Sequence, residues 1–183
     1  MSDAAAHPRT GLPGELIMWV LIVSELAVFG AALLIFLVLR LGDPAGFAAA
    51  QDQLHRLSAG VNTVVLVTSG LAAALAVRAA EGGQRAATRR WLAAAALLGG
   101  VFLALKGVEY ADAASRGIGL ETHVFFTFYW LLTLFHAAHV LAGMILLGIV
   151  AIRARADAVE AAGQFWHMVD LVWVMLFPVI YLL

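Results

Sequence analysis

The sequence predicts an all-α integral membrane protein, built as a bundle of five transmembrane helices. Hydrophobic residues make up 63% of the 183 residues and charged residues only 13%. A soluble domain of this size would lack a polar surface at that composition. Charges also gather between long apolar stretches, as expected where a chain leaves the hydrocarbon layer. Lipid is therefore the expected solvent.

Each of five stretches is long enough to cross the bilayer, which takes about 20 mostly apolar residues. The expected helices cover residues 16–39, 57–77, 91–110, 124–150 and 163–183. Pro178 is expected to bend the last turns of the fifth helix. No long loop separates the stretches, so residues 16–183 are predicted to form one membrane domain after a polar tail at residues 1–15.

The arginines predict the orientation, because cytoplasmic loops carry an excess of positive charge. The side of the N-terminus holds Arg9, Arg78, Arg85, Arg89, Arg90, Arg153 and Arg155, and the opposite side Arg40, Arg56 and Arg116. The N-terminus is therefore predicted to be cytoplasmic and the C-terminus periplasmic, in the inner membrane of a bacterium. On the outer side, residues 44–60 are expected to lie on the membrane surface as an amphipathic helix, with Leu54 and Leu57 facing lipid.

Composition also excludes several functions. The net charge of −1 comes without a basic tract that could neutralise phosphates, so nucleic acid is not an expected partner. The chain has no cysteine. Disulfides, iron–sulfur clusters, thiolate catalysis and C-x-x-C-H attachment of haem are excluded with it.

Glu25 is the most deeply placed acid. It lies nine residues after Leu16, so a rise of 1.5 Å per residue places it roughly 13 Å into a layer about 30 Å thick. Intramembrane acids are costly to keep and are functional hypotheses by default. Glu25 is either a proton-exchange or gating site, or a neutral acid hydrogen-bonded to a neighbouring helix.

Two further pairs repeat a three-residue spacing that places both members on one helix face. They are His136 with His139 in the fourth helix and His167 with Asp170 in the fifth. We expect the two faces to meet in a polar cluster that opens to the cytoplasm, with His139 at the depth of Glu25 and the fifth-helix pair nearer the surface. The alternative is a purely structural network of interhelical hydrogen bonds.

Lys106 and Glu109 form a third pair, near the outer end of the third helix. Their spacing allows an ion pair that stabilises the bundle. The lysine could alternatively extend to water at the interface. A structural role is favoured in either case.

Haem within the chain is a weaker hypothesis. Only His136, His139 and His167 lie inside the expected spans. A haem–copper centre needs more imidazole ligands than these three. No metal ligand or catalytic residue is therefore assigned. A small bis-histidine haem b anchor would place His136 or His139 opposite His167. A proton-coupled transporter built on Glu25 is the other alternative, although the chain shows no internal repeat.

Five motifs in chain order resemble the subunit III proteins of haem–copper oxidases, in their short five-helix form. They are Met18-Trp19 through Ser24-Glu25-Leu26; Asn62-Thr63 followed by Thr68-Ser69-Gly70; Phe102-Leu103 leading to Glu109-Tyr110; Phe135-His136-Ala137-Ala138-His139-Val140 with Gly143; and Glu160 before Trp166-His167-Met168-Val169-Asp170 and Trp173. Within that family, Lys106 and Phe177-Pro178 look like the NorE-type proteins that accompany nitric oxide reductases.

The resemblance implies an accessory subunit without a cofactor of its own. Such a subunit packs beside the catalytic haem-containing subunit I, which carries the haem and the copper or iron, stabilises it during turnover and holds phospholipid. On this analogy Glu25 supports proton uptake or oxygen access. The implied polar framework comprises Lys106, Glu109, His136, His139, His167 and Asp170, and the implied lipid contacts are Glu160, His136 and Trp166.

Overall fold

The computed structural model describes residues 16–183, and these residues are helical without a strand. The elements are α1 (Leu16–Gly42), α2 (Pro44–Gln51), α3 (Arg56–Glu81), α4 (Arg85–Ser115), α5 (Val124–Arg153), α6 (Ala156–Phe177) and the π-helix η1 (Pro178–Leu182). Five of them are long and apolar enough to cross a membrane: α1, α3, α4, α5 and α6 with η1. The predicted all-α fold with five spanning helices is confirmed. The tail predicted at residues 1–15 lies outside the described residues.

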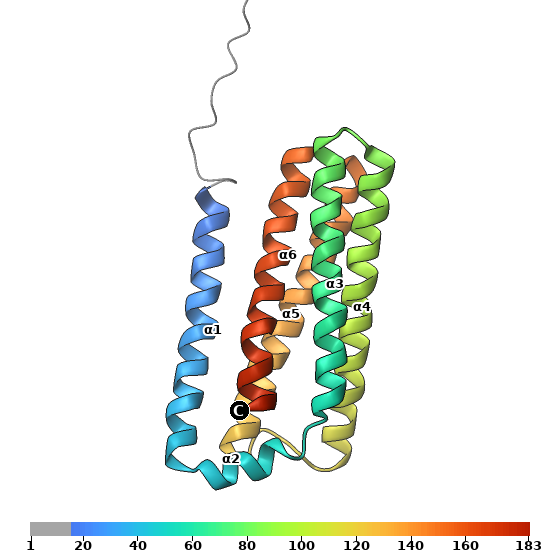
Figure 1. Ribbon diagram of the computed structural model, residues 1–183. Helices are drawn as coiled ribbons and strands as arrows, with labels where there is room; N and C mark the ends of the chain where they lie inside the picture. Colours follow the sequence, from blue (N-terminus) through green and yellow to red (C-terminus); the bar gives the residue numbers. More distant parts are fainter. Residues whose placement is uncertain (1–15) are drawn as a thin grey trace, which may run out of the picture.

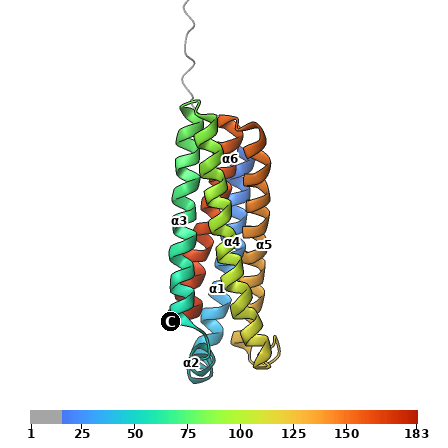
Figure 2. The same ribbon diagram turned by 90° about the vertical axis from the view of Figure 1, so that its right-hand side faces the viewer.

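Helices α3 to α6 form the body of the bundle (Figures 1 and 2). In this group α3 packs on α4 and α6, and α5 packs on the same two helices. Helix α1 stands to one side, against α6 and less extensively against α5. Most of α1 is therefore exposed, and its buried side chains are Phe29, Leu33 and Phe36.

The helices extend beyond the apolar stretches that predicted them. Helix α4 begins at Arg85 rather than residue 91 and ends at Ser115 rather than residue 110. The largest difference is in α6, which begins at Ala156 rather than residue 163. Charged residues are compatible with a helix once it reaches the polar interface, so the apolar stretch marks the membrane core rather than the ends of the helix.

The surface helix is shorter than predicted. Helix α2 ends at Gln51, and α3 begins at Arg56. Leu57 is 83% exposed, as expected of a lipid-facing residue, but Leu54 is only 6% exposed, so the prediction for Leu54 was wrong. The chain turns from α2, which lies across one end of the bundle in Figure 1, into α3, and Leu54 in this turn is part of the hydrophobic core.

Small residues allow α4, α5 and α6 to approach closely around Trp166. A Cβ atom on Gly99 or on Gly143 would lie 2.7 Å from the indole ring. The indole Nε1 donates a hydrogen bond of 3.0 Å to the hydroxyl of Ser69, which itself donates to the carbonyl of Ala95 at 2.7 Å. Four helices are thus joined at one buried ring.

Pro178 marks the change of helix type near the C-terminus. Because proline has no N–H, it cannot donate the hydrogen bond that would continue α6. The chain continues from Pro178 as the π-helix η1, whose wider turn is closed by a hydrogen bond of 3.0 Å from the Leu183 N–H to the Pro178 carbonyl. The departure from α-helical geometry therefore begins at Pro178, the residue that was expected to bend the helix.

Candidate functional site

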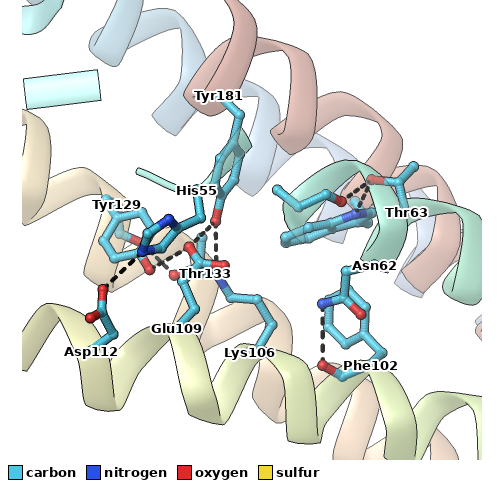
Figure 3. Close-up of polar contacts among 12 residues, drawn as sticks. His55, Asn62, Thr63, Phe102, Lys106, Glu109, Asp112, Tyr129, Thr133 and Tyr181 are labelled. Carbon is cyan, nitrogen blue, oxygen red and sulfur yellow. Dashed lines mark hydrogen bonds and ion pairs between the residues drawn. The ribbon is translucent and has the colours of Figure 1, made fainter. Parts of the chain in front are cut away.

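Lys106 and Glu109 form a fully buried ion pair. Their side chains are 1% and 5% exposed, and Nζ lies 3.1 Å from Oε1. Lys106 donates to the hydroxyl of Tyr181 at 2.7 Å, and that hydroxyl donates to Glu109 Oε1 at 2.7 Å. Tyr129 donates to the same oxygen at 2.8 Å (Figure 3). The ion pair that the spacing allows is therefore present, and the lysine does not extend to water.

Aromatic rings surround the ammonium group of Lys106. Nζ lies 4.7 Å from the ring centre of Tyr110, 5.0 Å from Tyr129, 5.5 Å from Tyr181 and 5.6 Å from Trp173. The negative faces of such rings attract a cation, most strongly where water is excluded. This arrangement offsets part of the cost of burying the charge.

The tyrosines of this cluster were not identified from the sequence. A tyrosine inside a spanning helix needs a partner for its hydroxyl, and that requirement was the available signal. Its partner could not be assigned, because Tyr181 reaches Lys106 and Glu109 from the far end of the chain. The C-terminal backbone is held in place by Gln51, which donates to the carbonyl of Ile180 at 2.9 Å, and by Arg40, which donates to the carbonyl of Leu183.

Glu25 and His139 meet between α1 and α5. Glu25 Oε2 lies 3.3 Å from His139 Nε2, and the two side chains are 19% and 17% exposed. The equal depth expected from the sequence is consistent with this contact. The rings of Phe29 and Phe135 pack against the imidazole, with ring centres at 5.9 and 4.6 Å.

The hydrogen bonds of His139 determine what this pair can do. Its Nδ1 lies 2.8 Å from the carbonyl of Phe135, which can only accept, so this nitrogen is assigned the proton. In a neutral imidazole, Nε2 is then an acceptor. A hydrogen bond between Nε2 and the carboxyl of Glu25 therefore requires one further proton, on either group. In the structure itself, Glu25 Oε2 is enclosed and has no hydrogen-bond partner within residues 16–183.

His136 is fully buried and stands apart from that pair. Its ring stacks on Trp173 at 5.2 Å and meets the ring of Phe102 edge-on at 5.6 Å. Neither ring nitrogen has a hydrogen-bond partner among residues 16–183. Its surroundings are aromatic, so the spacing to His139 does not place both imidazoles in one polar site.

His167 and Asp170 lie on another face, between α6 and α3. His167 Nδ1 is 3.8 Å from Asp170 Oδ2, and the side chains are 49% and 12% exposed. The carboxyl lies over Gly70 of α3, where a Cβ atom would be 2.1 Å from Oδ2. The expected meeting of this pair with His136 and His139 was wrong, because the two pairs lie on different faces of the bundle.

Asp170 lies near the middle of the last spanning helix. Because α6 begins at Ala156, Asp170 lies 14 residues, or about 21 Å, along the helix. The spanning helix continues to Leu182. Residues before 163 continue the helix beyond the apolar stretch, so the depth counted from that stretch stays a prediction.

Two of the three implied lipid contacts are inaccessible. Trp166 and His136 are both 0% exposed, enclosed by neighbouring helices, so lipid at the surface of this chain cannot reach them and these assignments were wrong. Glu160 is partly exposed. Within the described chain, no group of three or more His, Asp or Glu side chains is arranged to hold a metal ion.

Comparison with known proteins identifies the family. The family model described as cytochrome c oxidase subunit III matches residues 10–183. The chain belongs to the cytochrome c oxidase subunit III family. The resemblance found in the five motifs is thereby confirmed at the level of the family, and the protein is a multi-pass membrane protein.

Relatives within the subunit III family come from several bacteria. The chain is 32% identical to cytochrome c oxidase subunit 3 of Corynebacterium diphtheriae, over 88% of this chain and 84% of the relative. It is 32% identical to the protein of the same name in Synechocystis, over 97% and 80%. It is 30% identical to a probable cytochrome c oxidase subunit 3 of Mycobacterium tuberculosis, over 90% and 84%. A special likeness to NorE-type proteins stays a prediction.

Proposed function

We propose that this chain is the accessory subunit III of a bacterial haem–copper oxidase, packed beside the catalytic haem-containing subunit I in the inner membrane. The observation that carries the proposal is the family match along residues 10–183. In this proposal haem and copper belong to the partner, and this chain contributes a scaffold. The buried cluster around Lys106 supports a scaffold role, because it ties α4, α5 and η1 together inside the bilayer.

The Glu25–His139 pair is the part of the chain that we propose to act during turnover. A proton added to either group would allow a hydrogen bond between Oε2 and Nε2, which lie 3.3 Å apart, and both side chains keep partial exposure. A group that binds one proton within the membrane can exchange it with a water chain or a neighbouring subunit. Its proposed role is to assist proton uptake from the cytoplasmic side, where the arginine distribution places the N-terminus. Oxygen access past α1 is the other role that Glu25 would support.

Phospholipid is proposed as the second partner. Helix α1 exposes most of its apolar surface, including Val20 and Val23, while Glu160 near the start of α6 is partly exposed. Apolar side chains at the membrane core together with a polar group near the interface suit a lipid with its headgroup at the cytoplasmic surface.

Affinity purification from the native membrane in mild detergent tests the proposal. The expected product is a complex in which this chain accompanies a larger haem-containing subunit, with a Soret band in its optical spectrum. Copper and the haem types identify an oxidase, whereas a copper-free partner with haem and non-haem iron identifies the nitric oxide reductase that the NorE-like features favour. A colourless oligomer of this chain alone would overturn the assignment. Mass spectrometry of the complex reports retained phospholipids.

A further inference from the structure

All three tyrosines of the chain lie around the ammonium group of Lys106. They are Tyr110 of α4, Tyr129 of α5 and Tyr181 of η1. Tyr129 and Tyr181 are 0% exposed, whereas Tyr110 is only partly buried. Phenols and indoles are the side chains that lose a single electron most readily in a protein without cysteine. The cluster therefore gathers every phenol of the chain at one buried place.

Two tryptophans extend this group of oxidisable rings. The ring centre of Trp130 lies 5.5 Å from that of Tyr129, which lies 6.4 Å from that of Tyr181. Trp173 follows at 6.2 Å from Tyr181. Trp130 is partly exposed, whereas the other three rings are buried. The rings therefore form a continuous series of short steps from the buried tyrosines to the surface of α5 at Trp130.

The hydroxyls of Tyr129 and Tyr181 share one proton acceptor. Both donate to Oε1 of Glu109, at 2.8 and 2.7 Å (Figure 3). A phenol becomes strongly acidic when it loses an electron, so its neutral radical forms most easily beside a base. The indole nitrogen of Trp130 has no hydrogen-bond partner in the described part of the chain, and that of Trp173 donates only to an alcohol. Oxidation of this group of rings should therefore settle on the two tyrosines.

We propose that Tyr129 and Tyr181 are a redox-active pair, in which one tyrosine gives an electron to a strong one-electron oxidant and its hydroxyl proton to Glu109. The phenol O–H bond breaks, an O–H bond forms at Oε1 and a neutral tyrosyl radical remains. Trp130 relays the electron to the oxidant, which is reduced by one electron. Return of an electron and of the proton from Glu109 restores the starting state. The oxidant is an oxidised metal centre of the neighbouring subunit, and this assignment rests on the proposed function.

Lys106 accounts for the charge that the step leaves behind. Before the step, the ammonium group and Glu109 balance each other at 3.1 Å. Once Glu109 is protonated, the remaining positive charge is that of Lys106, which four aromatic rings already surround. A buried charge without its counter-ion is costly. The pair should therefore be oxidised only by a strong oxidant, and the radical should be reduced again readily.

Electron paramagnetic resonance of the full chain in mixed micelles tests the pair. A photo-oxidised ruthenium polypyridyl complex, with a cobalt ammine complex as electron acceptor, supplies the oxidant, and the sample is frozen after illumination. The expected product is a tyrosyl radical, whose spectrum narrows when the chain contains ring-deuterated tyrosine. No tyrosyl radical in the folded wild-type chain would overturn the proposal.

Variants with fewer tyrosines assign the radical. Tyr110→Phe removes the tyrosine outside the pair and should keep the signal. The double variant Tyr129→Phe with Tyr181→Phe leaves Tyr110 alone and should lose it, to the level of samples kept dark. Circular dichroism confirms that each variant is helical. A radical that is lost in folded Tyr110→Phe, or kept in the folded double variant, would contradict the proposal.

Glu109 and Trp130 can be tested separately. Glu109→Gln can still accept a hydrogen bond but is a far weaker base, and it is combined with Lys106→Met so that no buried charge is left unpaired. This variant should lose most of the radical while it stays folded. Trp130→Phe should lower the radical yield, whereas Trp91→Phe, at a position of α4 that is 40% exposed, should not. Wild-type yields in both test variants would contradict the proposed step.

The redox proposal and the proposed function fail in different ways. If the chain retains no haem subunit, the proposed function fails, while the experiment on the chain alone still decides whether the pair is redox-active. If the complex forms and the chain alone gives no tyrosyl radical, only the redox proposal is wrong. In a complex assembled with the deuterated chain, hydrogen peroxide added to oxidise the haem iron should produce the narrowed spectrum. A spectrum without narrowing would place the radical in the partner and overturn the assignment of the oxidant.

Discussion

The Lys106 cluster and the Glu25–His139 pair are both ionisable groups inside the membrane, but they differ in how completely this chain satisfies them. Around Lys106, a carboxylate, two hydroxyls and four rings enclose the charge, and the side chain is 1% exposed. Glu25 Oε2 lies 3.3 Å from His139 Nε2 without a hydrogen bond, and the Glu25 side chain is 19% exposed. The comparison shows that the two sites differ in closure, because the Lys106 cluster is sealed inside the bundle while the Glu25 and His139 side chains stay partly exposed.

The difference follows from where the two sites lie. The Lys106 cluster joins elements that already pack closely, because α4 and α5 are neighbours and η1, packed on α6 and α3, brings Tyr181 to Lys106. Glu25 is on α1, the helix that stands apart from the body of the bundle (Figure 1). A charge at a tight junction can be given several partners, whereas one at an open edge depends on water, lipid or another subunit.

The largest expected effect on stability comes from removing the charge of Lys106 from its buried cluster. Lys106→Met leaves Glu109 buried without its cation, so the free energy of unfolding should fall by about 3–5 kcal/mol. Unfolding of the purified chain in mixed micelles, titrated with denaturing detergent, measures the loss. The double variant Lys106→Met with Glu109→Gln should recover most of it, because no buried charge is then unpaired. Arg155→Ala, which removes an exposed ion pair, should change stability by less than about 1 kcal/mol.

Removing one hydroxyl from the same cluster should have a smaller effect. Tyr181 both accepts from Lys106 and donates to Glu109, whereas Tyr129 donates only to Glu109. Tyr181→Phe is therefore expected to cost about 2–3 kcal/mol, and Tyr129→Phe roughly half as much. The same unfolding titration ranks the two variants. Equal losses would show that the bond from Lys106 to Tyr181 contributes little.

At the Glu25–His139 pair, a substitution is expected to change function more than stability, which is the opposite of the result expected for the Lys106 cluster. Glu25→Ala should alter the free energy of unfolding by less than about 1 kcal/mol, since the carboxyl is partly exposed and has one partner. Proton uptake by the complex, or the number of turnovers before inactivation, should fall. Glu81→Ala, at the end of α3, is the matched control. Unchanged proton uptake together with unchanged inactivation kinetics in Glu25→Ala would refute a functional role.

The sequence predicted the fold well because the bilayer imposes a strong length requirement. Five apolar stretches gave five spanning helices. The ends were less accurate, since polar residues continue a helix through the interface, and α6 therefore begins at Ala156 rather than at residue 163. Spacing within one helix also predicted the Lys106–Glu109 pair correctly.

The candidate site was predicted only where the relevant contacts were local. Spacing along one helix does not reveal which neighbour that face meets, so His136 was expected in a polar cluster and lies between aromatic rings. The roles of Tyr181 and Gly70 depend on helices far apart in the sequence. The contact between Glu25 and His139 could have been predicted, because the depth of each residue can be counted along its helix.

The smallest expected effect lies outside the membrane, at Asp43. Its carboxylate accepts a hydrogen bond of 3.0 Å from the N–H of Gly46 and caps α2, and it lies 3.1 Å from His123. The hydrogen bond from Gly46, followed by that from His123, holds the pKa of Asp43 below its ordinary value. Because the folded pKa lies below the unfolded one, the stabilisation is present above about pH 4 and is lost as the pH falls through the folded pKa.

Asp43→Asn isolates the charge from the cap, since an asparagine oxygen can still accept from Gly46. At pH 7 the variant should unfold at a slightly lower temperature than the wild type, because the hydrogen bond from His123 then no longer ends on a charged carboxylate. Below pH 4 the two curves should converge, because the wild-type carboxyl becomes protonated and neutral as well. A temperature difference that persisted unchanged at low pH would mean that the side-chain amide disturbs the cap itself. Convergence would show that an exposed charge at the membrane surface contributes only while ionised, in contrast to the enclosed charge of Lys106.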